Sequence, residues 1–206
     1  MSARLAFATV ETPIGPMLLA GTDAGIAALS RDTSLGTFLA ALRRRFPDAE
    51  PVADAPALRR PSAWLRAYLS GRRSDLPVVD LRGLAAWDAR VYQAVRTIPY
   101  GETATYGEVA LAIGSAGAAR AVGGSLSRCP LYPAVPCHRV VLAGEGVSGW
   151  GGGDIAVKRR LLDLERAGSS PIRMRDARPA PVTLPPIAHR RSTTWQQLSP
   201  NRHPSS

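Results

Sequence analysis

The hydrophobic pattern of this 206-residue chain changes near residue 84. Before that point, short runs of apolar and β-branched side chains are separated by turn residues, a pattern typical of strands. Strands are predicted over residues 4–10, 17–21 and 25–30, and the turn at residues 12–16 joins the first two into a hairpin. A chain of this length can bury a real core and hold one or two small domains.

Two helices and one more strand complete the first half. Apolar side chains at helical spacing predict helices over residues 33–45 and 61–69, the second with Pro61 at its first position, where a missing N–H costs nothing. Residues 75–81 are predicted to form an edge strand, because Pro77 has no N–H to give to a ladder. The first 84 residues are therefore expected to form a small α+β domain.

The chain after residue 84 is predicted to be mainly helical. Thr105, with Glu108 three residues later, has the capping-box pattern at the start of a short helix, and another short helix follows after a turn. This pair predicts a helix-turn-helix in a domain that spans residues 85–168. Residues 128–153 are expected to be loop and short strand. The predicted helices cover residues 86–97, 106–113, 117–127 and 156–167.

The end of the chain is rich in proline and arginine, and the whole chain has a high positive charge. Residues 169–206 hold seven prolines, six arginines and one acidic residue, which predicts a disordered basic tail. The formal charge of +10 comes almost entirely from arginine, since Lys158 is the only lysine. Such a charge favours a polyanionic partner. A GC-rich genome would give the same composition, and a solvated tail without a role is the alternative for residues 169–206.

The start of the chain and its cysteines predict a cellular compartment. Residues 1–5 have no long apolar core behind them, so no secretory signal is expected, and no apolar run is long enough to span a membrane. Two cysteines give no disulfide framework, although Cys129 and Cys137 are able to form one bridge. A cytoplasmic protein with free thiols is expected.

The segment Pro136-Cys137-His138 places a thiol beside an imidazole. A thiolate is a strong nucleophile, and a nearby imidazole is the usual group that generates it. A lone cysteine is more often buried and inert. The fixed backbone at Pro136 and the glycine-rich segment 149–153, which lets a ligand approach closely, favour a nucleophile. No spacing of cysteines and histidines supplies a metal site, so none is expected.

His138 needs a partner that fixes its tautomer and stabilises its charge. Glu165 is the candidate, because its spacing places it on one helix face with Leu161 and Leu162. Those leucines should face the core and draw Glu165 inward. The alternative is a surface glutamate on a charged helix.

The predicted helix 117–127 carries mostly Ala, Gly and Ser, with Arg120 as its long side chain. Such a helix can press its backbone against a partner, and a protruding arginine suits insertion into a DNA groove. Tight packing within the core is the alternative use of small residues. Tyr106, at the start of the preceding helix, is placed either to meet the same partner or to pack half-buried.

Four segments, in their order and spacing, resemble one family, the O6-alkylguanine-DNA alkyltransferases, also called methylated-DNA–protein-cysteine methyltransferases. The resemblance covers about residues 5–168 and implies an α+β fold with an RNase H-like N-terminal domain and a winged helix-turn-helix alkyltransferase domain. The matching segments are IPYGETATYGEVA (98–110), AARAVGG (118–124), VPCHRVV (135–141) and GWGGG (149–153), followed by Lys158, Leu161, Leu162 and Glu165.

The resemblance also implies an activity: DNA repair by irreversible, stoichiometric transfer of an alkyl group from O6 of guanine, and from O4 of thymine, to Cys137. His138 would act as base through a water, oriented by Glu165. Tyr106 would crowd the 3′ phosphate and donate a proton to guanine N3. Arg120 would fill the gap left by the flipped base.

The implied partner is double-stranded DNA carrying O6-alkylguanine, met by a monomer in the cytoplasm that is nucleoid-associated when on DNA. No cofactor is implied, because the alkyl group comes from the substrate. The DNA-binding face would include Ala119, Ala121 and Gly123 beside Arg120, and the base pocket would be lined by Val140, Trp150 and Gly151.

Cys129 departs from the family, which usually has Asn at this hinge position, where it ties the recognition helix to the active-site loop. Cysteine is a poor substitute as donor and acceptor. We therefore expect weaker coupling between DNA binding and Cys137, and lower activity. A Cys129–Cys137 disulfide would block the reaction and is expected to be absent in the reduced cytosol.

Three other functions fit the sequence less well. A lesion-binding relative without transfer usually has Trp in place of the reactive cysteine, so Cys137 argues against it. A helix-turn-helix regulator would need the Gln, Asn and Arg set that reads the major groove, which residues 117–127 lack. A thiol hydrolase would need an acyl pocket and a separate downstream histidine, and neither is recognisable.

Overall fold

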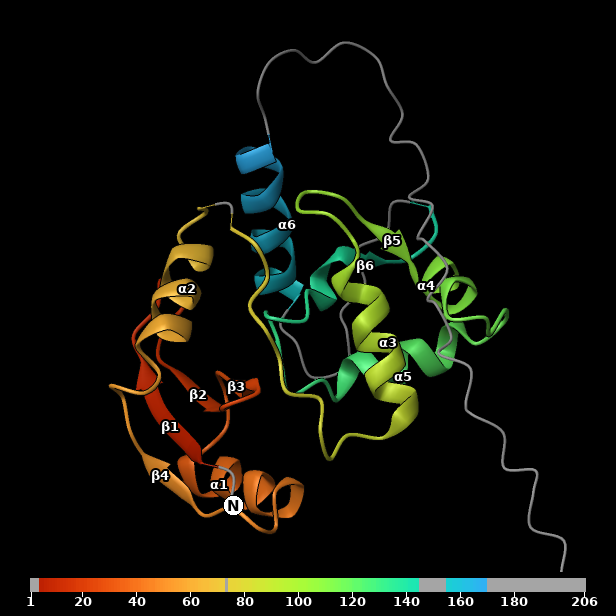
Figure 1. The fold of residues 1–206 in the computed structure, drawn as a ribbon. Coiled ribbons are helices and arrows are strands. Elements are labelled where there is room, and N and C mark those ends of the chain that lie inside the picture. The colour runs from red at the N-terminus through yellow and green to blue at the C-terminus, as the bar shows by residue number, and fades with distance from the viewer. Residues whose placement is uncertain (1–3, 73, 145–154, 170–206) are drawn as a thin grey trace, which may run out of the picture.

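The structure, a computed structural model, describes residues 4–72, 74–144 and 155–169. It confirms the α+β class: a four-stranded sheet with two helices comes first, and a mainly helical half follows (Figure 1). The predicted tail beyond residue 169 and the glycine-rich segment 149–153 lie outside the described residues. None of the described helices is both long and apolar enough to cross a membrane.

The N-terminal sheet has the strand order β3-β2-β1-β4. β2 (Met17–Thr22) pairs antiparallel with both β1 (Leu5–Val10) and β3 (Gly25–Ser30), which confirms the three predicted strands and the hairpin. β4 (Pro51–Ala53) pairs in parallel with β1 at the far edge. No sequence pattern predicts β4, because three residues are too few to show a period of two.

The segment 75–81, predicted as an edge strand, forms only an isolated bridge between Val79 and Ile26, so that prediction is wrong. Two backbone hydrogen bonds join Ile26 to this segment. Other carbonyl groups of the segment accept hydrogen bonds from side chains instead of from a neighbouring strand. This leaves no continuous ladder, although the segment does lie beside β3. The side-chain donors are Arg45, Trp64 and Arg96.

Two helices accompany the sheet. α1 (Leu35–Arg45) begins after Ser34, whose side chain accepts a hydrogen bond from a backbone N–H of the first turn. α2 (Arg59–Leu69) begins before Pro61, so the proline is not at the first helical position as predicted. It still lies in the first turn, where the N–H groups have no helical partner. The inner face of α2 buries Ser62, Leu65, Tyr68 and Leu69.

The helical half contains the four predicted helices and two short parallel strands. The capping box at the start of α4 is present, since Thr105 and Glu108 each accept a hydrogen bond from the other's backbone N–H. A single 3-10 turn, η1, precedes the second short strand. The elements are α3 (Ala86–Arg96), β5 (Ala104–Thr105), α4 (Tyr106–Ala112), α5 (Ala119–Ser127), η1 (Cys137–Arg139), β6 (Val140–Val141) and α6 (Ile155–Ser169).

One hydrophobic core joins the two halves of the chain. A backbone hydrogen bond of 2.7 Å from Leu29 N, on β3, to Pro130 O, after α5, adds a direct link. The change of pattern near residue 84 is therefore a change of secondary structure between two halves that share a core, and the division into domains 1–84 and 85–168 stays a prediction. The core members include Leu19, Ile26, Leu65, Val95 and Leu161.

We predict that Gly83, where the chain leaves the sheet for the helical half, does not tolerate a side chain. Its φ is +71°, and an added Cβ would lie 2.5 Å from Arg45 O. Gly83→Ala should lower the free energy of unfolding by about 1–3 kcal/mol, because a left-handed backbone and the clash both cost energy. Urea unfolding measures the change. Gly36→Ala is the control, because Gly36 is exposed on α1 with nothing within 4 Å of an added Cβ. Equal stability of the two variants would contradict the prediction.

Candidate active site

The predicted nucleophile lies in the buried turn η1. Cys137 and His138 are each 0% exposed, and Arg139 is 2% exposed. Two backbone hydrogen bonds fix the turn, from Cys137 N to Val135 O at 2.8 Å and from Arg139 N to Pro136 O at 2.9 Å. α6 packs against this turn, so the residues of the turn lie beside those of α6.

Burial is the main influence on the Cys137 thiol. It raises the pKa of the thiol well above its usual range, and a hydrogen bond with the Cys129 side chain raises it further, whereas the charge of Lys158 acts in the opposite direction. The resting thiol is therefore protonated at neutral pH. A reaction at the sulfur requires a base that removes this proton.

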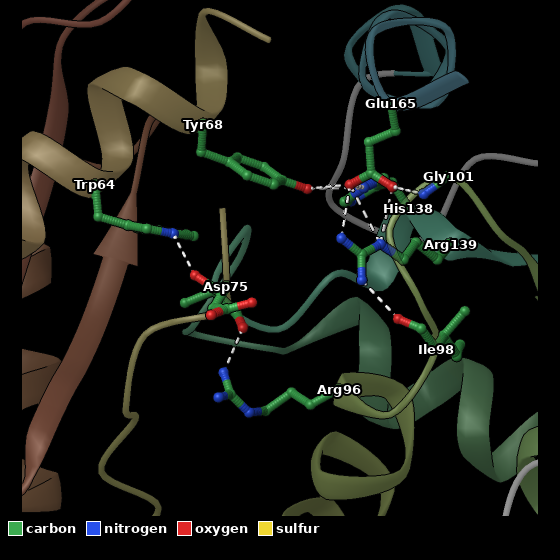
Figure 2. Close-up of polar contacts among 10 residues, drawn as sticks. Trp64, Tyr68, Asp75, Arg96, Ile98, Gly101, His138, Arg139 and Glu165 are labelled. Carbon is green, nitrogen blue, oxygen red and sulfur yellow. Dashed lines mark hydrogen bonds and ion pairs between the residues drawn. The ribbon is translucent and has the colours of Figure 1, made fainter. Parts of the chain in front are cut away.

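His138 meets Glu165 of α6, the partner expected from the helix pattern. The His138 Nε2 and Glu165 Oε1 atoms are 2.8 Å apart (Figure 2). Burial lowers the pKa of His138, although Glu165 acts to raise it, so the imidazole is neutral at neutral pH. Across the described part of the chain, no hydrogen-bond partner is found for His138 Nδ1.

Glu165 is the centre of the polar network in Figure 2. Arg139 donates to both carboxylate oxygens at 2.9 Å, Gly101 N donates to Oε2 at 2.9 Å, and the Tyr68 hydroxyl donates to Oε1. Burial opposes the negative charge, but the hydrogen bonds from His138 and Arg139 outweigh it and lower the pKa of Glu165 to about 2. Because an ionised carboxylate only accepts, His138 Nε2 carries a proton and Nδ1 carries the free lone pair.

Two side chains of this network, those of Arg139 and Tyr68, are not among the predicted site residues. Arg139 belongs to the VPCHRVV segment, so its position beside His138 was the available signal. Tyr68 shares the inner face of α2 with Leu65 and Leu69. This spacing predicts that the side chain is buried, but it does not predict which group the hydroxyl binds.

Lys158 is a buried cation on α6. Its Nζ donates to Val140 O at 2.7 Å and lies 5.9 Å from the ring centroid of Tyr106. Burial lowers the pKa of Lys158 to about 8. Lys158 therefore links the strand after Cys137 to the start of α4. Of the residues predicted for the base pocket, Val140 is buried here, whereas Trp150 and Gly151 lie outside the described residues.

α5 carries the residues predicted to contact DNA. Arg120 and Ala121 are exposed, and Ala119 and Gly123 are partly exposed. A Cβ added to Gly123 would lie 3.7 Å from Tyr106 Cε1, so the tyrosine sits directly over the helix at this point. The structure thus brings Tyr106 and the small-residue face of α5 together.

Cys129, the residue that departs from the family pattern, lies two residues after the end of α5. It is partly buried against the core and, like Cys137, is a free thiol. Asp88 of α3 holds the preceding turn in place, because its carboxylate accepts from the Ser125 hydroxyl and from Arg128 Nη2, the latter at 2.6 Å. The expected loss of coupling at Cys129 stays a prediction.

The chain is similar in sequence to known methylated-DNA–protein-cysteine methyltransferases over most of its length. Residues 86–167 match the family described as 6-O-methylguanine DNA methyltransferase, DNA binding domain. A methylated-DNA–protein-cysteine methyltransferase of Mycobacterium tuberculosis (strain H37Rv) is 40% identical over 167 residues, which cover 78% of this chain and 92% of that protein. One from Methanosarcina acetivorans is 36% identical over 160 residues, with 77% and 97% covered.

Solved structures show a related fold. The crystal structure of Mycobacterium tuberculosis OGT in complex with DNA is 38% identical, covers 80% of this chain and 94% of that one, and gives a TM-score of 0.62. The O6-methylguanine-DNA methyltransferase of Pyrococcus kodakaraensis strain KOD1 is 21% identical with a TM-score of 0.51, and this likeness concerns the fold alone.

Removal of the buried charge at Glu165 should destabilise the protein strongly. Glu165→Gln leaves Arg139 with no carboxylate, and breaking a buried pair in this way costs about 3–5 kcal/mol of unfolding free energy. The matched control is Asp163→Asn on the same helix. The Asp163 side chain is 75% exposed and its ion pair with Arg166 is 3.9 Å long. Asp163→Asn should therefore change the unfolding free energy by no more than the experimental error. Urea unfolding of both variants checks the prediction, and equal effects would contradict it.

Proposed function

Because the chain belongs to the family of methylated-DNA–protein-cysteine methyltransferases, it repairs alkylated DNA by transferring the alkyl group to a cysteine of its own, and we propose that this cysteine is Cys137. The observation that carries the proposal is one buried turn in which Cys137, with a protonated thiol, is followed by His138, whose neutral imidazole is oriented by Glu165. Cys129, just after α5, is hydrogen-bonded to the Cys137 thiol and is less deeply buried than Cys137.

The reaction moves one alkyl group and, in net, one proton from the thiol to guanine: His138 takes the thiol proton, Tyr106 gives one to guanine, and exchange with solvent restores both side chains. His138 Nδ1 takes the proton of Cys137 through a bridging water, and Glu165 stabilises the imidazolium that forms. The sulfur attacks the alkyl carbon in line with its bond to O6, so the S–C bond forms as the C–O bond breaks. The departing guanine gains one proton and leaves neutral. The product is a stable thioether, so each chain reacts once.

Access to O6 requires that the nucleotide leave the duplex, because O6 lies inside the base stack. Arg120, exposed on a helix of small residues, enters the minor groove and fills the gap, which offsets part of the unstacking energy. The small residues around it, Ala119, Ala121 and Gly123, let the DNA backbone approach α5. Tyr106 crowds the 3′ phosphate and gives a proton to guanine N3.

The proposal also covers the two domains, the base pocket, the oligomeric state and the cellular location. Residues 1–84 would be the RNase H-like domain, supported by the β3-β2-β1-β4 order, and residues 85–168 the winged helix-turn-helix domain, supported by the packing of α4 on α5. The base pocket, with Val140, Trp150 and Gly151, would take O6-alkylguanine and O4-alkylthymine. The protein would act as a monomer in the cytoplasm, nucleoid-associated while on DNA, and without a cofactor.

The proposed nucleophile is tested by mass. After incubation with a duplex that holds O6-methylguanine, the Cys137 peptide should gain about 14 Da, the mass of one CH2 added to the nucleophile. The gain should stop at one per chain, because the thioether is not cleaved. Cys129→Ser is the matched control and should keep the gain. No gain in the wild-type protein, or a gain that persists in Cys137→Ser, would refute the assignment.

A substitution at Arg120 distinguishes binding and opening of the duplex from the transfer reaction itself. Arg120→Ala should slow repair of duplex DNA by about tenfold or more, because the extruded state loses its intercalating side chain. Transfer from the free base O6-benzylguanine should change little, since no duplex has to be opened. Single-turnover rates on both substrates measure the difference. Equal losses on the two substrates would count against the proposed role.

A further inference from the structure

A hydroxyl group from the N-terminal half of the chain reaches the catalytic pair of the helical half. Tyr68 of α2 donates to Glu165 Oε1, and its oxygen lies 3.1 Å from His138 Nε2 (Figure 2). All three side chains are at most 1% exposed. Because they come from α2, η1 and α6, only the tertiary fold brings them together.

The ring of Tyr68 is held by its neighbours. Trp64 stacks on it with ring centroids 5.2 Å apart, and Tyr100 meets it edge-on at 6.3 Å. Trp64 is fixed in turn, because its Nε1 donates to Asp75 O at 3.0 Å. A phenol packed in this way has its hydroxyl preorganised toward the carboxylate.

The hydroxyl shares one carboxylate oxygen with His138. Since an ionised carboxylate only accepts, the Tyr68 proton points to Glu165, and the phenol oxygen faces the Nε2–H of His138. This contact restricts rotation of the imidazole. It also leaves Oε1 less able to stabilise an imidazolium, because part of its negative charge is already engaged by another donor.

We propose that Tyr68 is a positioning residue for alkyl transfer, through which the N-terminal half of the chain sets the orientation and basicity of His138. The inference rests on the proposed function of His138 as the base for Cys137. The titratable and charged groups that border His138 are Glu165 and Lys158 on α6, Cys137 and Arg139 on η1, Tyr132 before η1 and Tyr68 on α2. Of these, Tyr68 alone belongs to the first half of the chain.

Tyr68→Phe in the full-length protein tests the proposal, because it keeps the ring and removes the hydroxyl. The rate of transfer from O6-benzylguanine at neutral pH should fall by on the order of three- to tenfold, the worth of one buried hydrogen bond. The acid limb of the pH–rate profile should move to higher pH. A titration of His138 followed by 15N NMR should show the pKa of the imidazole moving in the same direction, with His138→Gln identifying its signals.

Tyr92→Phe is the matched control. Tyr92 is 1% exposed, and its hydroxyl donates to Ser125 O at 2.9 Å instead of to the catalytic pair. It should keep the wild-type imidazole titration, with thermal unfolding used to show that both variants are folded. A Tyr68→Phe protein whose imidazole titrates as in the wild type, or a Tyr92→Phe protein with an equal shift, overturns the proposal. Failure of the proposed function would appear differently, as a wild-type protein that accepts no alkyl group.

Discussion

The ionised carboxylate of Glu165 is the group on which the arrangement of the site depends. A buried charge is stable only when it is paired and hydrogen-bonded. Donors to this carboxylate come from three separate parts of the fold, so the site forms only when these parts have packed against α6. They are Tyr68 on α2, Gly101 N in the turn before β5, and His138 and Arg139 on η1. The carboxylate in turn determines which nitrogen of His138 carries a proton and which is free to accept one.

The same burial that requires a paired Glu165 keeps the Cys137 thiol protonated. A protonated, enclosed thiol is a poor nucleophile toward electrophiles in solution. For a protein that reacts once, this restricts the reaction to a substrate placed against the sulfur and its base. Lys158 limits the effect, since its charge lies close enough to favour the thiolate once the proton has gone. In the proposed mechanism the reactivity of the site depends on proton removal by His138, and the adjacency of Cys137 and His138 in the sequence is not enough to provide it.

The sequence predicted the elements whose hydrophobic pattern is strong and the one partner that a helix pattern can reveal. Glu165 was placed toward His138 by its spacing from Leu161 and Leu162, and the structure brings the two side chains together. Tyr68 was visible only as a buried residue of an amphipathic helix, because its hydrogen bonds reach residues 70 and 97 positions away. The segment 75–81 has the composition of a strand, but arginine and tryptophan side chains bind its carbonyls, and such contacts cannot be predicted from local pattern.

We propose that His138 removes the proton of a thiol that does not ionise by itself, and the pH dependence of transfer tests this role most directly. The rate constant for transfer from O6-benzylguanine to the wild-type protein should rise with pH only until the imidazole is neutral. Because burial lowers the pKa of His138, this rise should end below its ordinary value of 6.5, and the rate should then be flat up to about pH 8. A rate that instead increases about tenfold per pH unit from pH 6 to 8 would show that solvent ionises the thiol without His138, and would contradict the account.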